Sequence, residues 1–336
     1  MSKPPKSPDE NVNQPDIPGE MAAGADLTNL WTPEASLART TELWQPVSFS
    51  KLEETFEQGQ QIGRYEVVRK LGDGGFATVY LARDPESGWL VAIKRPRAHA
   101  LSDPTLRGRF LREQQALKQL RHEGVCRFLS FSLHESAVFL VTEYIDGPTL
   151  QDVMVEQHIP DLACRTGWAI ELVVTLANIM ADVHAQGYVH RDLKPSNIMF
   201  RADGRPVIVD LGLVRGDRSC EEALTRTGVV MGTVAYMSPE QAEGEAVRAG
   251  PATDVYSLGV ILFELLTGRV PFVGKRERVL YDVIRTNPPS PRTIRPDLDE
   301  GLESVCLTAL SKKSRERFGG TMSGFSAALR PHCREY

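Results

Sequence analysis

The chain has 336 residues, of which 41% are apolar and 25% are charged, and its formal net charge is −5. These fractions are those of an ordinary globular protein, and the negative charge excludes the basic surface that broad nucleic-acid binding needs. Five cysteines without a close pair indicate reduced thiols rather than a disulfide framework or a zinc site. We expect no nucleic-acid partner.

Membrane and targeting segments are not expected from the sequence. The best candidate for a membrane span, Val255 to Leu266, is short and carries Glu264. The first residues lack the apolar core of a signal peptide. The sequence therefore predicts a cytoplasmic protein without a membrane segment in this chain.

Residues 1–60 are predicted to be an N-terminal extension that is largely disordered. Residues 1–28 are rich in Pro, Asp, Glu, Asn and Gly and show no hydrophobic period, so they bury too little apolar surface to become ordered. The rest of the extension carries several large apolar side chains, namely Trp31, Trp44, Phe49, Leu52 and Phe56. Two alternatives stay open: a linker with a few apolar residues, or a segment that packs on the following domain and regulates it.

Ordered structure is expected from Arg64 onward. Residues 65–68 and 78–81 are rich in strand-forming side chains on either side of a glycine-rich turn, which predicts a β-hairpin. Residues 89–93 predict a third strand. Residues 104–120 then carry apolar side chains at helical spacing, which predicts a helix.

Two further strands follow, and the second ends at residues 138–141. Residues 170–184 form a long amphipathic pattern and residues 254–267 an almost wholly apolar one, and both are typical of helices. Strands that come first and helices that come later predict an α+β fold with two lobes, joined near residues 143–147.

A glycine-rich turn occupies residues 71–79, Leu-Gly-Asp-Gly-Gly-Phe-Ala-Thr-Val. Glycine lets a backbone approach phosphate oxygens closely and present its amides to them, although a plain hairpin turn would explain the same residues. The next strand ends in Lys94, whose ammonium needs an acidic partner if it is buried. Glu113 is the favoured partner and Glu123 the alternative, while an unpaired surface lysine would be the simpler explanation.

The most informative segment is residues 190–197, His-Arg-Asp-Leu-Lys-Pro-Ser-Asn. It combines a carboxylate, two cations and an amide, the groups needed to handle a nucleoside triphosphate, its metal and an attacking hydroxyl. It fits the catalytic-loop pattern H-R-D-L-x-x-x-N of protein kinases. Residues 209–212, Val-Asp-Leu-Gly, stand where that family usually has D-F-G, with Leu211 in place of Phe. Residues 232–240 fit the pattern G-T-x-x-Y-x-x-P-E.

The other motifs agree in type and order. Residues 91–94 read Val-Ala-Ile-Lys, and the glycine-rich turn fits G-x-G-x-x-G-x-V except that Ala77 replaces the last glycine. The chain therefore resembles a bacterial-type, eukaryotic-like (Hanks-type) serine/threonine protein kinase. The resemblance implies a kinase domain over residues 64–332, with a small, mainly antiparallel β lobe at 64–143 and a larger, mainly α-helical lobe at 148–332.

The resemblance also implies roles in phosphoryl transfer, where positioning and charge stabilisation dominate. Asp192 would orient the substrate hydroxyl and accept its proton, and Lys194 would neutralise charge on the γ-phosphoryl group. Asn197 and Asp210 would hold Mg²⁺ through oxygen atoms, with Mn²⁺ as an alternative ion. Thr233 would bridge Asp192 and Lys194 by hydrogen bonds.

ATP is the cofactor that the resemblance implies. Lys94 and Glu113 would form the ion pair that holds the α- and β-phosphates. The connection from Glu143 to Ile145 would offer backbone groups to the base. The implied ATP-binding residues are Leu71, Gly72, Asp73, Gly74, Gly75, Phe76, Ala77, Val79, Ala92, Lys94, Thr142, Glu143, Ile145 and Met199. Without the resemblance, the apolar residues among them would be read as ordinary core.

Regulation by phosphorylation is a further implication. A cation such as Arg191, just before the catalytic aspartate, typically pairs with a phosphate on the activation segment. Thr225 and Thr227 are the favoured acceptors for autophosphorylation, and solvated loop hydroxyls are the simpler alternative. A homodimer would bring two copies together for this reaction.

The implied activity is transfer of the ATP γ-phosphoryl group to Ser or Thr hydroxyls of protein substrates. Lys194 within Asp-Leu-Lys-Pro-Ser-Asn favours Ser and Thr over Tyr. Glu240 is expected to pair with Arg317, and Asp254 to tether the catalytic-loop backbone. Two alternatives remain: a pseudokinase, which usually loses catalytic residues that are all present here, and a small-molecule phosphotransferase, which typically lacks the segment at 232–240.

Overall fold

The computed structural model describes residues 55–74, 77–97, 118–134, 137–156, 162–210, 233–244 and 249–334. All of them belong to the second of two units in the chain, Ser48–Tyr336. The greater part of the helix predicted at 104–120, with Glu113, lies outside the described residues, and so do Thr225 and Thr227.

Six strands form one antiparallel sheet in the order β1-β2-β3-β4-β6-β5. Their bounds are β1 Gln61–Ile62, β2 Tyr65–Asp73, β3 Ala77–Arg83, β4 Leu90–Pro96, β5 Phe128–His134 and β6 Ala137–Glu143. β2 and β3 form the predicted hairpin, in which Gly72 pairs with Val79 and Asp73 with Thr78 next to the glycine-rich turn. On the other side of β3, Val79 pairs with Lys94. The sheet thus places the glycine-rich turn beside the lysine.

The sheet has its own apolar core. At the start of β2, buried Tyr65 and Val67 alternate with an exposed residue, as expected of a strand with one face turned inward. Phe56 packs against this core. Its ring stands edge-on to Tyr80, with 6.0 Å between ring centroids, and its centroid lies 4.4 Å from the Arg95 guanidinium. Phe56 is the one large apolar side chain of the N-terminal extension inside the described residues.

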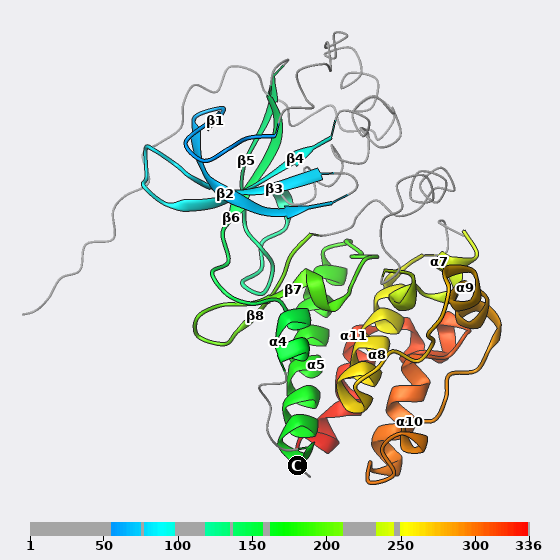
Figure 1. Ribbon diagram of the computed structural model, residues 1–336. Helices are drawn as coiled ribbons and strands as arrows, with labels where there is room; N and C mark the ends of the chain where they lie inside the picture. The colour runs from blue at the N-terminus through cyan, green and yellow to red at the C-terminus, as the bar shows by residue number, and fades with distance from the viewer. Residues whose placement is uncertain are drawn as a thin grey trace, which may run out of the picture. The chain divides into compact units, whose positions relative to one another are not determined.

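The rest of the described chain is mainly helical (Figure 1). The helices are α4 Leu150–Glu156, α5 Leu162–Ala185, α7 Pro239–Ala242, α8 Pro251–Thr267, α9 Arg276–Arg285, α10 Glu300–Ala309 and α11 Met322–Leu329. Short 3-10 turns lie at Pro195–Asn197, Thr233–Tyr236, Pro291–Thr293, Ser314–Glu316, Phe318–Gly320 and Arg330–Arg334. β7 Ile198–Phe200 and β8 Pro206–Ile208 form a separate antiparallel ribbon. The predicted α+β fold, an antiparallel part followed by a helical part, is confirmed.

The apolar helix predicted at residues 254–267 is observed as α8, which supports the site. Pro251 opens the helix, where its missing N–H costs no intrahelical bond. Gly268 closes the helix with a left-handed φ of 79°, and its N–H donates to the carbonyl of Glu264. Nearly all side chains between them are buried. The first turn of α8 carries Asp254, which is fully buried.

The prediction that residues 255–266 are the best candidate for a membrane span was wrong, because another helix passes the test for such a span. Among the described residues, the Arg165–Ala185 part of α5 passes that test by length and composition, and 56% of it is buried. α5 packs on α8 and α11, and its Ile170, Leu176 and Met180 are fully buried. Its place in the core accounts for its apolar composition.

Candidate active site

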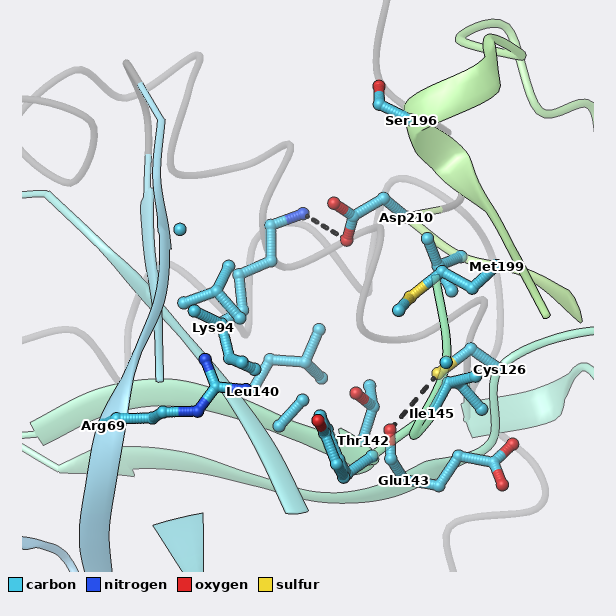
Figure 2. A pocket seen from close by; sticks show the side chains of 17 residues that line it. Arg69, Lys94, Cys126, Leu140, Thr142, Glu143, Ile145, Ser196, Met199 and Asp210 are labelled. Atoms are coloured by element: carbon cyan, nitrogen blue, oxygen red, sulfur yellow. Dashed lines mark hydrogen bonds and ion pairs between the residues drawn. The ribbon is translucent and has the colours of Figure 1, made fainter. Parts of the chain in front are cut away.

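A cavity of about 340 Å³ lies between the sheet, the connection after β6 and the β7–β8 ribbon (Figure 2). Its size is typical of small-molecule sites. The lining residues are Arg69, Leu71, Gly72, Val79, Ala92, Lys94, Cys126, Leu140, Thr142, Glu143, Tyr144, Ile145, Gly147, Ser196, Met199, Val209 and Asp210. The apolar side chains form the walls, and Lys94 and Asp210 supply charge at one end.

Most of the predicted ATP-binding residues lie around this cavity. Those that line it are Leu71, Gly72, Val79, Ala92, Lys94, Thr142, Glu143, Ile145 and Met199. Asp73, Gly74 and Ala77 are described but lie outside the lining, and Gly75 and Phe76 lie outside the described residues.

Asp73, in the glycine-rich turn, is held by three neighbours. Its carboxylate accepts a hydrogen bond of 3.0 Å from Oγ1 of Thr78 and pairs with Lys70 and Arg97. The hydrogen bond from Lys70 is the main cause of a lowered Asp73 pKa. The two cations offset a negative charge that would otherwise repel phosphate groups nearby.

Lys94 reaches across the cavity to Asp210. The Lys94 Nζ and Asp210 Oδ1 atoms are 3.0 Å apart. Figure 2 marks this ion pair with a dashed line. Attraction to Lys94 lowers the pKa of Asp210, which therefore stays ionised at neutral pH. Glu113, the predicted partner of Lys94, lies outside the described residues. Glu123, the alternative partner, lies on an exposed surface and pairs with Arg205 at 3.5 Å.

The segment at 190–197 gathers its polar groups around Asp192. The Asp192 Oδ2 atom accepts hydrogen bonds from Nζ of Lys194 at 3.0 Å and from Nδ2 of Asn197 at 3.3 Å. Nδ2 of Asn197 also donates to the Asp192 carbonyl at 2.8 Å. Because the amide nitrogen of Asn197 faces Asp192, its amide oxygen is the atom that can meet a cation.

His190 links the two carboxylate-bearing segments. It is fully buried, and burial lowers its pKa, so the ring is neutral at pH 7. Its Nδ1 accepts the N–H of Asp192 at 3.2 Å, which leaves Nε2 as the protonated nitrogen, 3.2 Å from the carbonyl of Val209. Val209 directly precedes Asp210, so one imidazole ties the Asp192 segment to the Asp210 segment.

As predicted, Asp254 tethers the backbone of the same segment. Its carboxylate accepts the backbone N–H groups of His190 at 2.8 Å and Arg191 at 2.7 Å, and Nε2 of His184 lies 2.8 Å away. Arg191 has a left-handed φ of 64°, and its carbonyl accepts a hydrogen bond of 2.8 Å from Nε2 of Gln241. Such a backbone conformation is costly for a non-glycine residue, and these bonds stabilise it.

The predicted pair of Glu240 and Arg317 is confirmed. Both carboxylate oxygens of Glu240 lie 2.8 Å from the two terminal nitrogens of Arg317, whose side chain is fully buried. Burial opposes the charge on Glu240, but the Arg317 guanidinium holds the pKa of Glu240 below its usual value. The pair fastens the start of α7 to the C-terminal helices.

Several lining residues were not predicted. Arg69 stands two residues before Leu71 in β2, and the period of two in a strand would have placed both on one face. Cys126 precedes β5, and no local pattern marks it. Its Sγ lies 3.6 Å from the carbonyl of Glu143, and burial raises the pKa of the thiol to about 12, so it is a neutral wall residue.

The oxygen donors near the cavity fit a metal that is shared with phosphate groups. Among the described residues, no cluster of three or more His, Cys, Asp and Glu side chains forms a metal site of protein atoms alone. Asp210 and the amide oxygen of Asn197 are hard oxygen donors. Mg²⁺ is commonly held by one or two such protein groups together with substrate phosphates. The side chain of Thr233, a predicted bridge, lies outside the description.

Residues 65–322 match the protein kinase domain family. The chain belongs to the protein kinase family. Members of this family use ATP and a divalent metal ion to transfer a phosphoryl group. The match covers both the sheet and the helices that support the cavity.

Relatives and solved structures agree with this membership. The chain is 36% identical over 263 residues to the probable serine/threonine-protein kinase SCO3848 of Streptomyces coelicolor, covering 76% of this chain and 38% of that protein. It is 37% identical over 260 residues to the serine/threonine-protein kinase PknB of Mycolicibacterium smegmatis, covering 76% of this chain and 41% of that protein. The aligned part thus spans about two fifths of these relatives.

A solved structure with a similar fold is the kinase domain of PknI from Mycobacterium tuberculosis. It matches with a TM-score of 0.65 at 24% identity, over 82% of this chain and 99% of that domain. At this identity the likeness shows the shared fold.

Proposed function

We propose that this kinase is an active, ATP- and Mg²⁺-dependent protein serine/threonine kinase. The observation that carries the proposal is two pairs of charged groups, one at an end of the cavity and one in the segment at 190–197. Lys94 and Asp210 lie 3.0 Å apart, and Asp192 lies within hydrogen-bonding distance of Lys194. Each group has the chemistry that phosphoryl transfer needs.

In the proposed reaction, the carboxylate of Asp192 orients a protein hydroxyl and accepts its proton as the hydroxyl oxygen attacks the γ-phosphorus. The bond from the γ-phosphorus to the ADP oxygen breaks, and ADP leaves. Lys194 offsets the charge that spreads over the transferred group, and Lys94 neutralises the phosphates that stay with ADP. Asp210 and Asn197 would hold Mg²⁺, and the ion would neutralise phosphate charge.

The choice of Ser and Thr rests on Lys194 within its loop and on the relatives, which are named serine/threonine-protein kinases. We include in the proposal that protein substrates are the acceptors and that the activation segment is autophosphorylated at Thr225 or Thr227, through a homodimer. Arg191 supports this step as the cation for a phosphothreonine. Mass spectrometry after incubation with ATP and Mg²⁺ tests it, because a fully active preparation without phosphate on either threonine would contradict autophosphorylation.

The central test is transfer of label from ATP to a generic basic protein, comparing wild type with Asp192→Asn. Loss of the base should lower kcat by roughly 10²- to 10⁴-fold, and the labelled residues should be Ser and Thr. Asp203→Asn, the same substitution at an exposed aspartate of the β7–β8 turn, should be as active as wild type. Equal inactivity of wild type and Asp192→Asn would favour a pseudokinase, and transfer only to small molecules would favour a phosphotransferase.

A further inference from the structure

The connection from β6 to α4 forms one wall of the cavity. Its residues Thr142, Glu143, Tyr144, Ile145 and Gly147 line the cavity. In Figure 2 the carboxylate of Glu143 points away from Lys94 and Asp210. A group that binds this carboxylate therefore also fixes the start of the connection that forms this wall.

Glu143 forms an ion pair with Arg201, the residue that follows β7. The Arg201 Nη2 and Nη1 atoms donate to the Oε1 and Oε2 atoms of Glu143 at 2.9 and 3.1 Å, a two-point contact with a fixed orientation. The backbone N–H of Arg127 donates to the same Oε1 at 2.8 Å, and the Glu143 N–H donates back to the Arg127 carbonyl at 2.9 Å. The Glu143 and Arg201 side chains are 17% and 29% exposed, so water weakens this pair less than it weakens an open surface pair.

The far end of the connection is fastened to the same strand. The N–H of Phe200 donates to the carbonyl of Pro148 at 3.0 Å, and Thr149 forms a β-bridge with Met199. A Cβ at Gly147 would lie 1.9 Å from the carbonyl oxygen of Phe200, so the connection can approach β7 this closely only because residue 147 is glycine. β7 thus anchors both ends of the wall and also carries Met199 into the cavity.

We propose that Arg201 is a positioning residue for the nucleotide, which through Glu143 fixes the distance between the connection backbone and Met199. This distance is the width of the slot that would receive the base. The inference rests on the proposed function for the identity of the nucleotide as ATP. Arg201 is not among the residues that line the cavity, so its effect reaches the nucleotide through Glu143 and β7.

The first test measures kinetics of the full chain with Arg201→Met. We expect KM for ATP to rise about fivefold, the loss of one partly buried charge pair, while kcat at saturating ATP and KM for the protein substrate change little. Arg205→Met is the matched control, because it removes the same charge from the same ribbon but a more exposed side chain that pairs with Asp203. Arg205→Met should keep the wild-type KM for ATP.

Two further variants separate positioning from general stability. Arg201→Lys keeps the charge but loses the planar fork, so it should restore only part of the affinity. Glu143→Gln should raise KM for ATP less than Arg201→Met, and the double variant should be no worse than Arg201→Met alone, because both changes break one contact. These two variants carry the test if Arg201→Met does not fold.

A second readout needs no nucleotide. Hydrogen exchange of the amides at 143–149 in the unliganded protein should be faster in Arg201→Met than in wild type or Arg205→Met. If wild type neither bound nor used ATP, the proposed function would fail while exchange still reported on the contact. An unchanged KM for ATP in Arg201→Met, unchanged exchange, additive effects in the double variant, or an equal effect of Arg205→Met would each overturn the inference.

Discussion

Two ion pairs of nearly equal length have opposite surroundings. Arg317 and Glu240 lie 2.8 Å apart with side chains 0% and 9% exposed, whereas Lys94 and Asp210 lie 3.0 Å apart with side chains 22% and 50% exposed. The first pair joins α7 to the segment between α10 and α11, and the second lies at one end of the cavity. Distance alone therefore does not tell which pair stabilises the fold and which serves the chemistry.

The difference lies in how deeply each pair is buried. The Arg317 guanidinium donates to both oxygens of Glu240 and to three backbone carbonyls, those of Ser311, Ala252 and Lys312. A buried charge with every partner supplied by the fold cannot change partners cheaply. The Lys94 ammonium and the Asp210 carboxylate face an open cavity. Phosphate groups can therefore replace Asp210 as the partner of Lys94, and a metal ion can replace Lys94 as the partner of Asp210. Burial thus separates a structural pair from the pair that is proposed to act in phosphoryl transfer.

Breaking the buried pair should have the largest effect on stability. Arg317→Met leaves the Glu240 carboxylate buried without its cation, and we expect a loss of ~3–5 kcal/mol in the free energy of unfolding. Urea denaturation measures this loss. Lys313→Met, which removes a cation from an exposed pair with Glu316, is the control and should unfold as wild type does. A loss below ~1 kcal/mol in Arg317→Met would contradict the comparison.

The tether at Asp254 should show a smaller loss of stability together with a loss of activity. Asp254→Asn replaces one acceptor oxygen by an NH₂ group among the N–H donors of His190 and Arg191, and we expect ~1–3 kcal/mol of destabilisation. Because the same bonds position Asp192, kcat should fall while KM for ATP changes little. Asp182→Asn, at an exposed aspartate beside His122, provides the control. Wild-type kcat in Asp254→Asn would show that the tether is not needed for catalysis.

For the exposed pair of Lys94 and Asp210, we expect a small loss of stability and a large loss of activity. Lys94→Met removes a cation that is partly solvated, so the free energy of unfolding should change by less than ~1 kcal/mol. Phosphoryl transfer should be lost, because Lys94 is proposed to neutralise the phosphates. Arg83→Met, at an exposed cation on β3, should change neither quantity. If Lys94→Met unfolded as readily as Arg317→Met, the distinction between the two pairs would be wrong.

How far the sequence could predict these features depends on whether a motif or the fold brings residues together. Strand and helix order followed from local periodicity, and Lys94, Asp192 and Asp210 followed from motifs of fixed spacing. The partners of Asp254 and Arg317 were predicted only because the family resemblance supplied the long-range contacts. No such guide existed for Glu143 and Arg201, which are 58 residues apart and meet only when β7 lies beside the connection.

Two other features, the place of Cys126 and the apolar length of α5, also depend on the fold and could not be predicted from local sequence. Cys126 reaches the cavity through a short segment before β5, where no period applies. The apolar length of α5 was not predicted, because α8 has the more uniformly apolar sequence. A core helix that contacts neighbours on several sides nevertheless needs apolar residues around most of its surface. The local sequence pattern predicts that a helix or strand forms. How much of its surface is buried depends on the elements that pack around it.

The smallest expected effect is a difference in pH dependence, and it again separates the buried pair from the open one. The pKa of Glu240 is lower in the folded protein than its ordinary value of 4.5, so the unfolded chain binds the proton more tightly. The stabilisation from this charge is therefore complete above the ordinary value and is lost as the pH falls through the lowered one. In Arg317→Met, burial without the cation raises the pKa of Glu240, so the sign of this group's contribution reverses and the variant should lose less stability than wild type as the pH falls.

Urea midpoints measured from about pH 7 down to about pH 2 for wild type, Arg317→Met and Lys94→Met test this sign, because the two pKa values are lowered from 4.5 and 3.8. The pKa of Asp210 is also lowered, mainly by Lys94, so Lys94→Met should lose part of the acid sensitivity of wild type. That loss should be smaller than the change in Arg317→Met, because the half-exposed Asp210 carboxylate can exchange its cation for water. Parallel curves for wild type and Arg317→Met would mean that burial does not set the energetic role of the Glu240 charge.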